Sequence, residues 1–257
     1  MVNMENQKPQ TAITYMGHST LYLESRGISI ITDPVLSNRV TFLHRTAPPL
    51  SNHDYKNADV VLISHLHFDH LDFPSLRQLN GKQRYIVPRG AAPVLSKAGF
   101  GNLQEVEIDE SVQIGDVTIR ATYAQHTRSR FPGGPKADCI GFVIRGDHTV
   151  YYPGDTRLFP QMAEIAGDLD IAFLPVWGWG PSRGREHMGP KEAAQSLKLL
   201  RPRYAVPIHW GTYLPIGLYW LKPVFHFNPP YDFLIHAREI APEVEVRILQ
   251  PGEVINL

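Results

Sequence analysis

The feature that most constrains this chain of 257 residues is a histidine-rich run directly after an apolar segment. Residues 60–63 read Val-Val-Leu-Ile, and the next seven residues include His65, His67, Asp69 and His70. Imidazoles bind borderline metals such as zinc, while a carboxylate offers a hard oxygen ligand to a second ion. The spacing therefore predicts a metal site at the end of a strand, in preference to a polar loop with ordinary surface histidines.

Three further strand-like segments also end in a His or an Asp. Residues 117–124 lead to His126, residues 150–154 lead to Asp155, and residues 204–208 lead to His209. Strand ends that line one rim of a sheet bring their following residues together. We therefore expect these side chains to converge with the histidine-rich run.

The chain resembles the metallo-β-lactamase superfamily, because His-x-His-x-Asp-His, a later lone His, Gly-Asp-Thr and Ile-His-Trp-Gly occur in the family's order. Within it, the chain is most similar to the branch of the N-acyl-phosphatidylethanolamine-hydrolysing phospholipase D and its bacterial relatives. The segments that carry this similarity are 32–35, 58–65, 154–156, 187–193 and 208–212. The resemblance implies an α/β (α+β) fold, a four-layer αββα sandwich of two mixed β-sheets flanked by helices. Periodicity alone would also fit a doubly wound sheet.

Carried over residue by residue, the resemblance implies two divalent metal ions. It assigns to one ion the ligands His65, His67 and His126. It assigns to the other ion Asp69, His70 and His209, and it makes Asp155 the carboxylate that bridges both ions. Two ions about 3.5–4 Å apart hold a hydroxide and lower the pKa of water from near 16 towards about 7. We expect Zn²⁺, although this thiolate-free set also suits Mn²⁺, Fe²⁺ or Ni²⁺.

Asp69 and His187 are the predicted catalytic residues, and the resemblance carries both roles. A carboxylate at the second metal can orient the nucleophile and transfer protons. His187 could stabilise a phosphoryl oxygen or protonate the leaving group, and the alternative is a helix-entry histidine without a catalytic role. The predicted substrate contacts are Arg183, Arg185 and Tyr213.

Positive side chains concentrate in two Pro/Gly-rich loops beside the predicted ligands. They are Arg128, Arg130, Lys136, Arg183 and Arg185. A phosphate or carboxylate on the substrate would suit them, and solvated loop charge is the alternative. We predict a dinuclear hydrolase that acts through a metal-bridging hydroxide on a phosphodiester, either a phospholipid or a small diester. Hydrolysis of a lactone, amide or thioester on the same centre, and a non-hydrolytic metal-binding protein, are the alternatives.

Composition constrains the partners. Lys plus Arg and Asp plus Glu both number 25, so no global field attracts nucleic acid or an anionic membrane.

With 43% hydrophobic residues, we expect one domain over residues 11–257 after a loose polar tail at residues 1–10. The tail lacks an apolar signal core and no segment is a spanning helix, so we expect a cytoplasmic protein with a small-molecule or lipid-like substrate. Residues 213–221 are apolar and aromatic, and either line the pocket or touch a membrane peripherally.

Local patterns predict the remaining elements. Strands are expected at 12–16, 20–24 and 28–32, and helices at 74–79, 91–98, 160–165, 190–200 and 231–240. His18 and Asp33 are expected at turns, where they would orient ligating imidazoles. Cys139 is expected to be a small core residue. Structural roles are expected for His44, His53, His148, His226 and His236.

Overall fold

The computed structural model describes residues 10–257 except 50–53, 166, 179–185 and 219–223. Its first sheet has seven strands in the order β17-β1-β2-β3-β6-β7-β8. Their bounds are β1 Thr11–Gly17, β2 Thr20–Ser25, β3 Ile28–Thr32, β6 Val60–Leu62, β7 Arg84–Pro88, β8 Leu103–Val106 and β17 Val254–Asn256. The pairings from β17 to β3 are antiparallel and those from β3 to β8 are parallel, so the sheet is mixed.

The second sheet also has seven strands, in the order β16-β14-β13-β12-β11-β10-β9. Their bounds are β9 Ser111–Ile114, β10 Val117–Tyr123, β11 Ile140–Arg145, β12 Thr149–Tyr152, β13 Ile171–Pro175, β14 Tyr204–Ile208 and β16 Glu245–Val246. Three pairings are parallel and three are antiparallel, so this sheet is mixed as well. Strands β10 and β12 run in the same direction, because both are antiparallel to β11.

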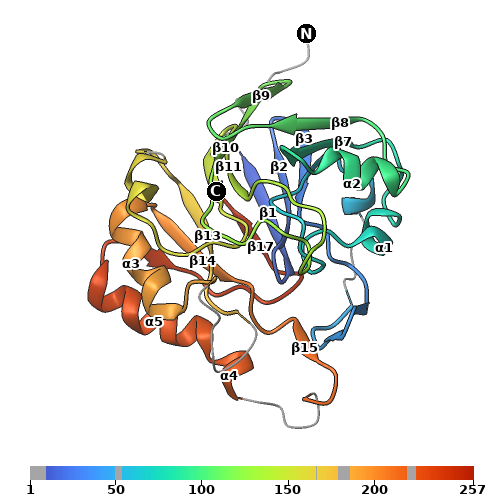
Figure 1. The fold of residues 1–257 in the computed structure, drawn as a ribbon. Coiled ribbons are helices and arrows are strands. Elements are labelled where there is room, and N and C mark those ends of the chain that lie inside the picture. Colours follow the sequence, from blue (N-terminus) through green and yellow to red (C-terminus); the bar gives the residue numbers. More distant parts are fainter. Residues whose placement is uncertain (1–9, 50–53, 166, 179–185, 219–223) are drawn as a thin grey trace.

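Helices cover the outer faces of both sheets (Figure 1). The α-helices are α1 Phe73–Leu76, α2 Ala92–Lys97, α3 Pro190–Leu200, α4 Val224–Phe227 and α5 Pro229–Ile240. The 3₁₀ helices are η1 Asp54–Asn57 and η2 Pro160–Glu164. Helices α1 and α2 pack on the first sheet, while α3 and α5 pack on the second. The expected four-layer αββα sandwich is therefore confirmed.

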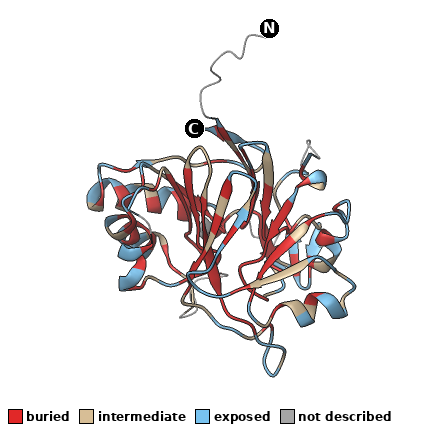
Figure 2. Cartoon of the chain, turned by 90° about the horizontal axis from the view of Figure 1, so that it is seen from above, coloured by how far each residue is buried: buried red, intermediate tan, exposed pale blue. Residues whose placement is uncertain are grey.

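The core lies between the two sheets and continues beneath the helices, as the buried strands in Figure 2 show. In β10, Val117, Ile119 and Ala121 face the inter-sheet core, which gives the alternation seen in the sequence. Phe142 and Phe173 are fully buried in the same layer. Each such side chain contributes about 1.5–3 kcal/mol when it is buried. The strand ends that carry the candidate ligands are therefore anchored in a rigid layer.

Several elements differ from the sequence-based expectation. Residues 160–165 were expected as an α-helix, but 160–164 form the 3₁₀ helix η2, with Pro160 at its first position. A small third sheet, in the order β15-β5-β4, was not expected. Its strands are β4 Arg39–Val40, β5 Leu43–Arg45 and β15 Tyr213–Pro215. The first part of the apolar 213–221 segment is therefore a strand paired with β5, and residues 219–221 lie outside the described part.

Candidate metal centre

Three imidazoles from two segments converge at the ends of β6 and β10. The Nε2 atom of His65 lies 3.0 Å from Nδ1 of His67, and Nε2 of His126 lies 3.0 Å from the same atom. One nitrogen from each ring is thus within ligand-sharing distance of the others. We call His65, His67 and His126 the three-histidine cluster.

The outer nitrogen of each of these rings meets an oxygen. His65 Nδ1 lies 2.9 Å from Ser64 Oγ, His67 Nε2 lies 3.1 Å from the Ser129 carbonyl, and His126 Nδ1 lies 2.9 Å from the Glu186 carbonyl. A neutral imidazole has one N–H and one lone pair, and a carbonyl only accepts hydrogen bonds. The N–H groups therefore point outward, and three lone pairs converge. Such an arrangement fits a metal ion, because lone pairs this close repel one another without a cation.

A second cluster forms around Asp69 from the ends of β6 and β14. His70 Nδ1 donates to Asp33 Oδ2 at 2.7 Å, and His209 Nδ1 donates to the Trp177 carbonyl at 2.7 Å. Their Nε2 atoms consequently carry the lone pairs, and they lie 3.9 Å and 3.6 Å from Asp69 Oδ2. We call Asp69, His70 and His209 the carboxylate cluster, and its ligand atoms are also close enough to hold an ion.

Asp155 lies between the two clusters. Its Oδ2 atom is 3.1 Å from His70 Nε2, 3.3 Å from His209 Nε2 and 4.0 Å from His126 Nε2. Its Oδ1 atom is buried and has no hydrogen-bond partner among the described residues. A buried carboxylate oxygen without a partner is costly, so a cation beside it would compensate. Asp155 is therefore a candidate for a ligand that both clusters share.

Electrostatics favour the ligand form of His65, His126, Asp69 and Asp155, but not that of His70 and His209. Burial lowers the pKa of His65 well below its usual value and that of His126 to about 4, so both rings are neutral near pH 7. Burial alone would raise the pKa of Asp69 and Asp155, but nearby imidazoles lower both well below the usual value. Neutral imidazoles and ionised carboxylates are the forms that bind metals. Burial alone would lower the pKa of His70 and His209, but the nearby Asp155 carboxylate raises that of His70 well above its usual value and that of His209 to about 9. These two rings would therefore release a proton when they bind a metal ion.

A buried network joins the two clusters, and the sequence revealed only part of it. Asp33 Oδ1 accepts from Ser64 N at 2.7 Å, while Asp33 Oδ2 accepts from Ser64 Oγ and Tyr152 OH, each at 2.5 Å, and from His70. Because Ser64 donates its hydroxyl proton to Asp33, it accepts from His65 Nδ1. The expected orienting role of Asp33 matches this geometry. Ser64 was missed, and its only sequence signal is its position next to His65.

Backbone conformation supports the same site. His18, Asp33 and His209 have φ values of 56°, 33° and 63°, in the left-handed region that non-glycine residues rarely adopt. Such strain concentrates at functional sites. Gly154 precedes Asp155, and a Cβ at this position would lie 2.5 Å from Ser64 Oγ. A side chain at residue 154 would therefore displace the network.

His18 and His187 both contact the candidate carboxylate ligands. His18 Nε2 donates to Asp69 Oδ2 at 3.1 Å, and its ring centroid lies 4.0 Å from that of His209. His187 Nε2 donates to Asp155 Oδ2 at 3.0 Å. His187 enters α3, whose start is stabilised where Glu192 Oε2 accepts from Gly189 N at 2.8 Å. The structure thus brings both histidines to the metal centre.

The predicted substrate residues fare differently. Arg183 and Arg185 lie outside the described residues. Tyr213 is 1% exposed, and its hydroxyl donates to the Ser37 carbonyl at 2.6 Å, so it is a packing residue and not a surface that meets substrate. The interpretation of Arg130 as a substrate-binding cation is also wrong, because the side chain is buried and bonded to backbone carbonyls.

Arg128 and the remaining singled-out residues have structural contacts. Arg128 forms an ion pair with Asp138. Cys139 is buried and donates to the Thr127 carbonyl at 3.4 Å, in line with a small core residue. His226 is buried against Trp177, with ring centroids 5.4 Å apart. His44, His148 and His236 are absent from both clusters, and His53 lies outside the described residues.

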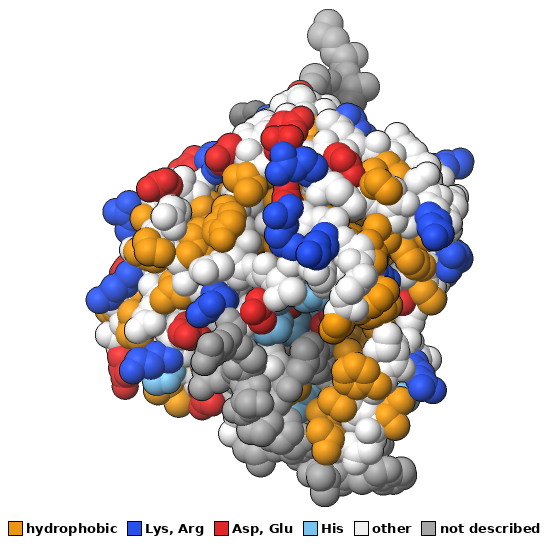
Figure 3. All heavy atoms as spheres, in the orientation of Figure 1, with side chains coloured by type: hydrophobic (Ala, Val, Ile, Leu, Met, Phe, Trp, Pro, Cys, Tyr) orange, Lys and Arg blue, Asp and Glu red, His pale blue; other side chains and the backbone are white. Residues whose placement is uncertain are grey.

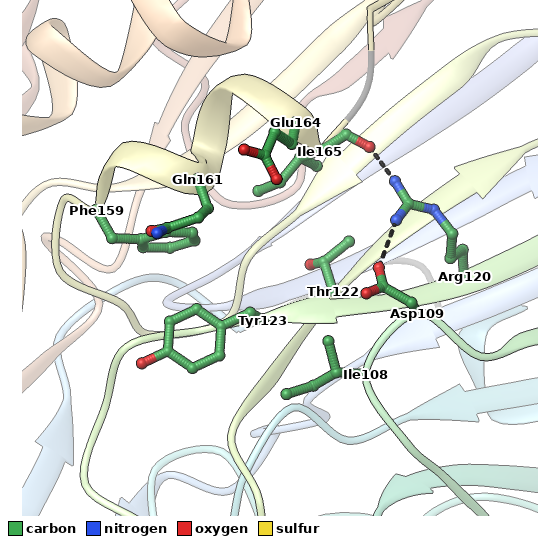
Figure 4. A pocket seen from close by; sticks show the side chains of 9 residues that line it. All are labelled: Ile108, Asp109, Arg120, Thr122, Tyr123, Phe159, Gln161, Glu164 and Ile165. Carbon is green, nitrogen blue, oxygen red and sulfur yellow. Dashed lines mark hydrogen bonds and ion pairs between the residues drawn. The ribbon is translucent and has the colours of Figure 1, made fainter.

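The candidate metal centre opens onto a hollow face of the molecule. Figure 3 shows histidine side chains at the bottom of this hollow and hydrophobic side chains gathered along one side of it. A separate cavity of about 430 Å³ lies between η2 and the end of β10 (Figure 4). It is lined by Tyr123 and Phe159 among others, and its Arg120 is bonded to Asp109 and to the Ile165 carbonyl. None of the candidate ligands lines it, so it is not the reaction site.

Comparison with known proteins gives matches over this whole region. Residues 29–210 match the model of the beta-lactamase superfamily domain. A metal-dependent hydrolase of Pyrobaculum islandicum is 33% identical over 254 residues, covering 95% of this chain and 99% of that protein. An N-acyl-phosphatidylethanolamine-hydrolyzing phospholipase D of Caenorhabditis elegans is 29% identical over 269 residues, covering 94% and 74%. The solved structure of Igni18, a metallo hydrolase of Ignicoccus hospitalis, has a TM-score of 0.71 at 25% identity and covers 96% of this chain and 98% of that one.

No helix in the described part of the chain combines the length and the apolar character that a bilayer crossing requires.

Proposed function

The chain belongs to the metallo-β-lactamase superfamily, and from this premise we propose that it is a hydrolase that uses two divalent metal ions, with zinc as the expected ion. The three-histidine cluster would hold one ion, the carboxylate cluster would hold the other, and Asp155 would be available to both. We also propose that residues 11–257 form one domain. The observation that carries the proposal is that five imidazoles each meet an oxygen at the outer nitrogen and gather their inner nitrogens in two clusters. Asp69 belongs to the second cluster, and Asp155 lies beside members of both.

Divalent ions at these clusters would supply Lewis acidity, which makes water nucleophilic near neutral pH and polarises the bond to be cleaved. The protein supplies orientation and proton transfer. Asp69 Oδ2 accepts a hydrogen bond from His18, which fixes the carboxylate beside His209. We propose that Asp69 takes the proton from the attacking water and passes it on, because it is an ionised carboxylate that is 13% exposed in the hollow.

His187 has a second role in this proposal. Its Nε2–H group holds Asp155 Oδ2, while its Nδ1 atom has no hydrogen-bond partner among the described residues. The ring therefore links Asp155 to the rim of the site. We propose that it orients Asp155 and, as an imidazolium with N–H groups on both nitrogens, stabilises negative charge that develops on the substrate during cleavage.

We propose a phosphodiester as the substrate class, either phospholipid or a small diester. The support is the similarity to the phospholipase D of Caenorhabditis elegans over 94% of this chain. Among the described cations singled out in the sequence, Arg128 and Arg130 are engaged within the protein, and Lys136 is exposed. This leaves Lys136 and, outside the described residues, Arg183 and Arg185 as the proposed anion contacts.

A lactone or other carbonyl substrate is the second candidate, and the engagement of Arg128 and Arg130 favours it. The experiment compares kcat/KM for bis(p-nitrophenyl) phosphate and for a neutral lactone in the zinc-loaded enzyme. Replacing Arg183 and Arg185 by Ala should weaken phosphodiester hydrolysis only, with each lost charged hydrogen bond costing about 1.5–3 kcal/mol if it is desolvated. Equal losses for both substrates, or none, would favour the carbonyl substrate. Loss of all hydrolysis on chelation is required in either case.

A further inference from the structure

Arg130 follows His126 by four residues, yet its side chain is built into the loop that carries the other ligands. One guanidinium nitrogen, Nη1, donates to the Leu66 carbonyl at 2.5 Å, and the other, Nη2, donates to the Leu71 carbonyl at 3.0 Å. These two carbonyls bracket residues 66–71, which include three candidate ligands. The planar fork of one arginine thus fixes the span of this loop.

Aromatic rings hold the guanidinium in place. Its central carbon lies 4.3 Å from the ring centroid of Phe68 and 5.0 Å from that of Phe73. Burial lowers the pKa of Arg130 to about 10, so the group is still charged near neutral pH. A desolvated cation is attracted to the faces of aromatic rings. The site is therefore specific for a flat cation with two diverging donors.

The residue next to Arg130 also contacts a candidate ligand. The Ser129 carbonyl accepts from His67 Nε2 at 3.1 Å, which fixes the tautomer of that ring. His126, Ser129 and Arg130 therefore act on one cluster from a single short segment. Arg128, on the same segment, points elsewhere and pairs with Asp138.

We propose that Arg130 is a positioning residue that sets the geometry of the three-histidine cluster by fixing the loop 66–71 from the segment 126–130. This inference rests on the proposed function, because it assumes that the cluster binds a metal ion. Two ligands of the carboxylate cluster, Asp69 and His70, also lie in this loop, but His18 holds Asp69 and Asp33 holds His70 independently of Arg130. The carboxylate cluster should therefore depend on Arg130 less.

The test compares Arg130→Lys with the matched control Arg128→Lys in the full chain. Lysine keeps the charge but cannot donate to both carbonyls from one plane. Co²⁺ is titrated into metal-free protein and followed by its ligand-field absorption, and a competing chelator gives the affinity of each site. His126→Ala and His209→Ala assign the two phases of the titration. Thermal unfolding of the metal-free proteins reports general damage to the fold.

We expect Arg130→Lys to weaken the three-histidine phase by about 10–100-fold, the range for residues that orient metal ligands. Its Co²⁺ spectrum at saturation should shift, while the carboxylate phase changes less. Arg128→Lys should leave both phases unchanged. In Arg130→Ala, millimolar guanidinium should restore part of the affinity, which a purely structural defect would not allow.

Overlapping titrations and spectra for Arg130→Lys and Arg128→Lys would overturn the inference while leaving the proposed function intact. If Arg130→Ala fails to fold, Phe68→Leu removes a cation–π contact without touching either carbonyl and should weaken the same phase. An unchanged three-histidine phase in Phe68→Leu and Arg130→Lys would again reject the inference. A wild-type protein that binds no Co²⁺ would instead overturn the proposed function itself.

Discussion

The three-histidine cluster and the carboxylate cluster lie side by side, but they differ in their ligand types and in the groups that hold their imidazole rings. In the first, all three ligands are imidazoles, and the outer nitrogens of His67 and His126 bond to backbone carbonyls. In the second, Asp69 is itself a carboxylate, and the outer partner of His70 is the carboxylate of Asp33. One cluster is a neutral set of imidazoles, and the other is a set that faces negative charge.

This difference predicts a division of labour. A neutral imidazole set leaves the full charge of a bound ion available to polarise a substrate, whereas carboxylates neutralise part of that charge and favour harder ions. Asp69 belongs to the second set, so the proton-accepting group lies on the side of the centre with more negative charge. The Ser64–Asp33 network keeps the two sets in register, because it contacts His65 on one side and His70 on the other.

The largest expected effect comes from removing one cluster at a time. His126→Ala and His209→Ala should each retain about one ion per chain where the wild type holds about two, since each loses one ligand of a different set. Both should lose turnover by orders of magnitude, because the proposed chemistry needs both ions. Elemental analysis and turnover of a generic phosphodiester measure this. A wild type that saturates at one ion per chain would remove the basis for comparing two clusters.

Asp69→Asn should have the next largest effect. The amide keeps the shape of the side chain but loses the charge that accepts a proton, so turnover should fall by about 10²–10⁴-fold. The three-histidine cluster should keep its ion, which elemental analysis would verify. Cys139→Ser serves as the control. Among the described residues, the buried thiol of Cys139 forms a hydrogen bond only to the Thr127 carbonyl. Normal turnover in a fully metallated Asp69→Asn protein would contradict the proposed role.

Replacements in the connecting network should act more weakly and on different sides. Asp33→Asn should reduce affinity mainly at the carboxylate cluster, and Ser64→Ala mainly at the three-histidine cluster, each by about 10–100-fold. The reason is that Asp33 holds His70 directly, while Ser64 holds His65. Competition with a chelator during Co²⁺ titration separates the two affinities. The same loss at both sites in both variants would mean that the network acts as one unit.

The superfamily motifs predicted the fold, which the periodicity of strands and helices alone left open, and the residues at the strand ends predicted that the ligand candidates converge. Strands such as 204–208 are apolar and end at a ligand, and the His-x-His-x-Asp-His run is specific enough to indicate a superfamily. The role of Arg130 could not be predicted. A buried cation is expected to pair with a carboxylate, and here its partners are two backbone carbonyls and two aromatic rings that only the folded loop assembles.

The prediction that Tyr213 contacts the substrate does not match the structure, for a related reason. Its position four residues after His209 suggested a pocket wall, but pairing of β15 with β5 turns the ring inward, where its hydroxyl meets the Ser37 carbonyl. Strand pairing over 168 positions, from Tyr213 to Arg45, leaves no signal in a single sequence. Tertiary packing thus determines which apolar residues face the site, whereas the metal ligands can be recognised from their residue types and spacing.

The smallest expected effect separates a ligand carboxylate from a structural one within the same run of residues. Asp72 lies three residues after Asp69, but its Oδ2 atom caps α1 by accepting from Ser75 N at 3.1 Å, and it also accepts from Ser37 Oγ at 2.7 Å. Asp72→Ala should therefore cost about 0.5–2 kcal/mol of stability, the usual range for a lost N-cap, and Asp72→Asn should cost less because it keeps an acceptor.

Comparing thermal unfolding with and without bound metal separates a helix cap from a metal ligand. An ion that binds only the folded state stabilises it according to its affinity, so a residue that orients ligands lowers the melting temperature more in loaded protein than in metal-free protein. A cap lowers both by the same amount. Thermal unfolding of Asp72→Ala with and without Zn²⁺ should therefore show equal shifts, whereas Asp69→Ala should show a larger shift in the loaded form. A larger shift for Asp72→Ala in the zinc-loaded protein would mean that Asp72 contributes to metal binding in the carboxylate cluster and is not only a helix cap.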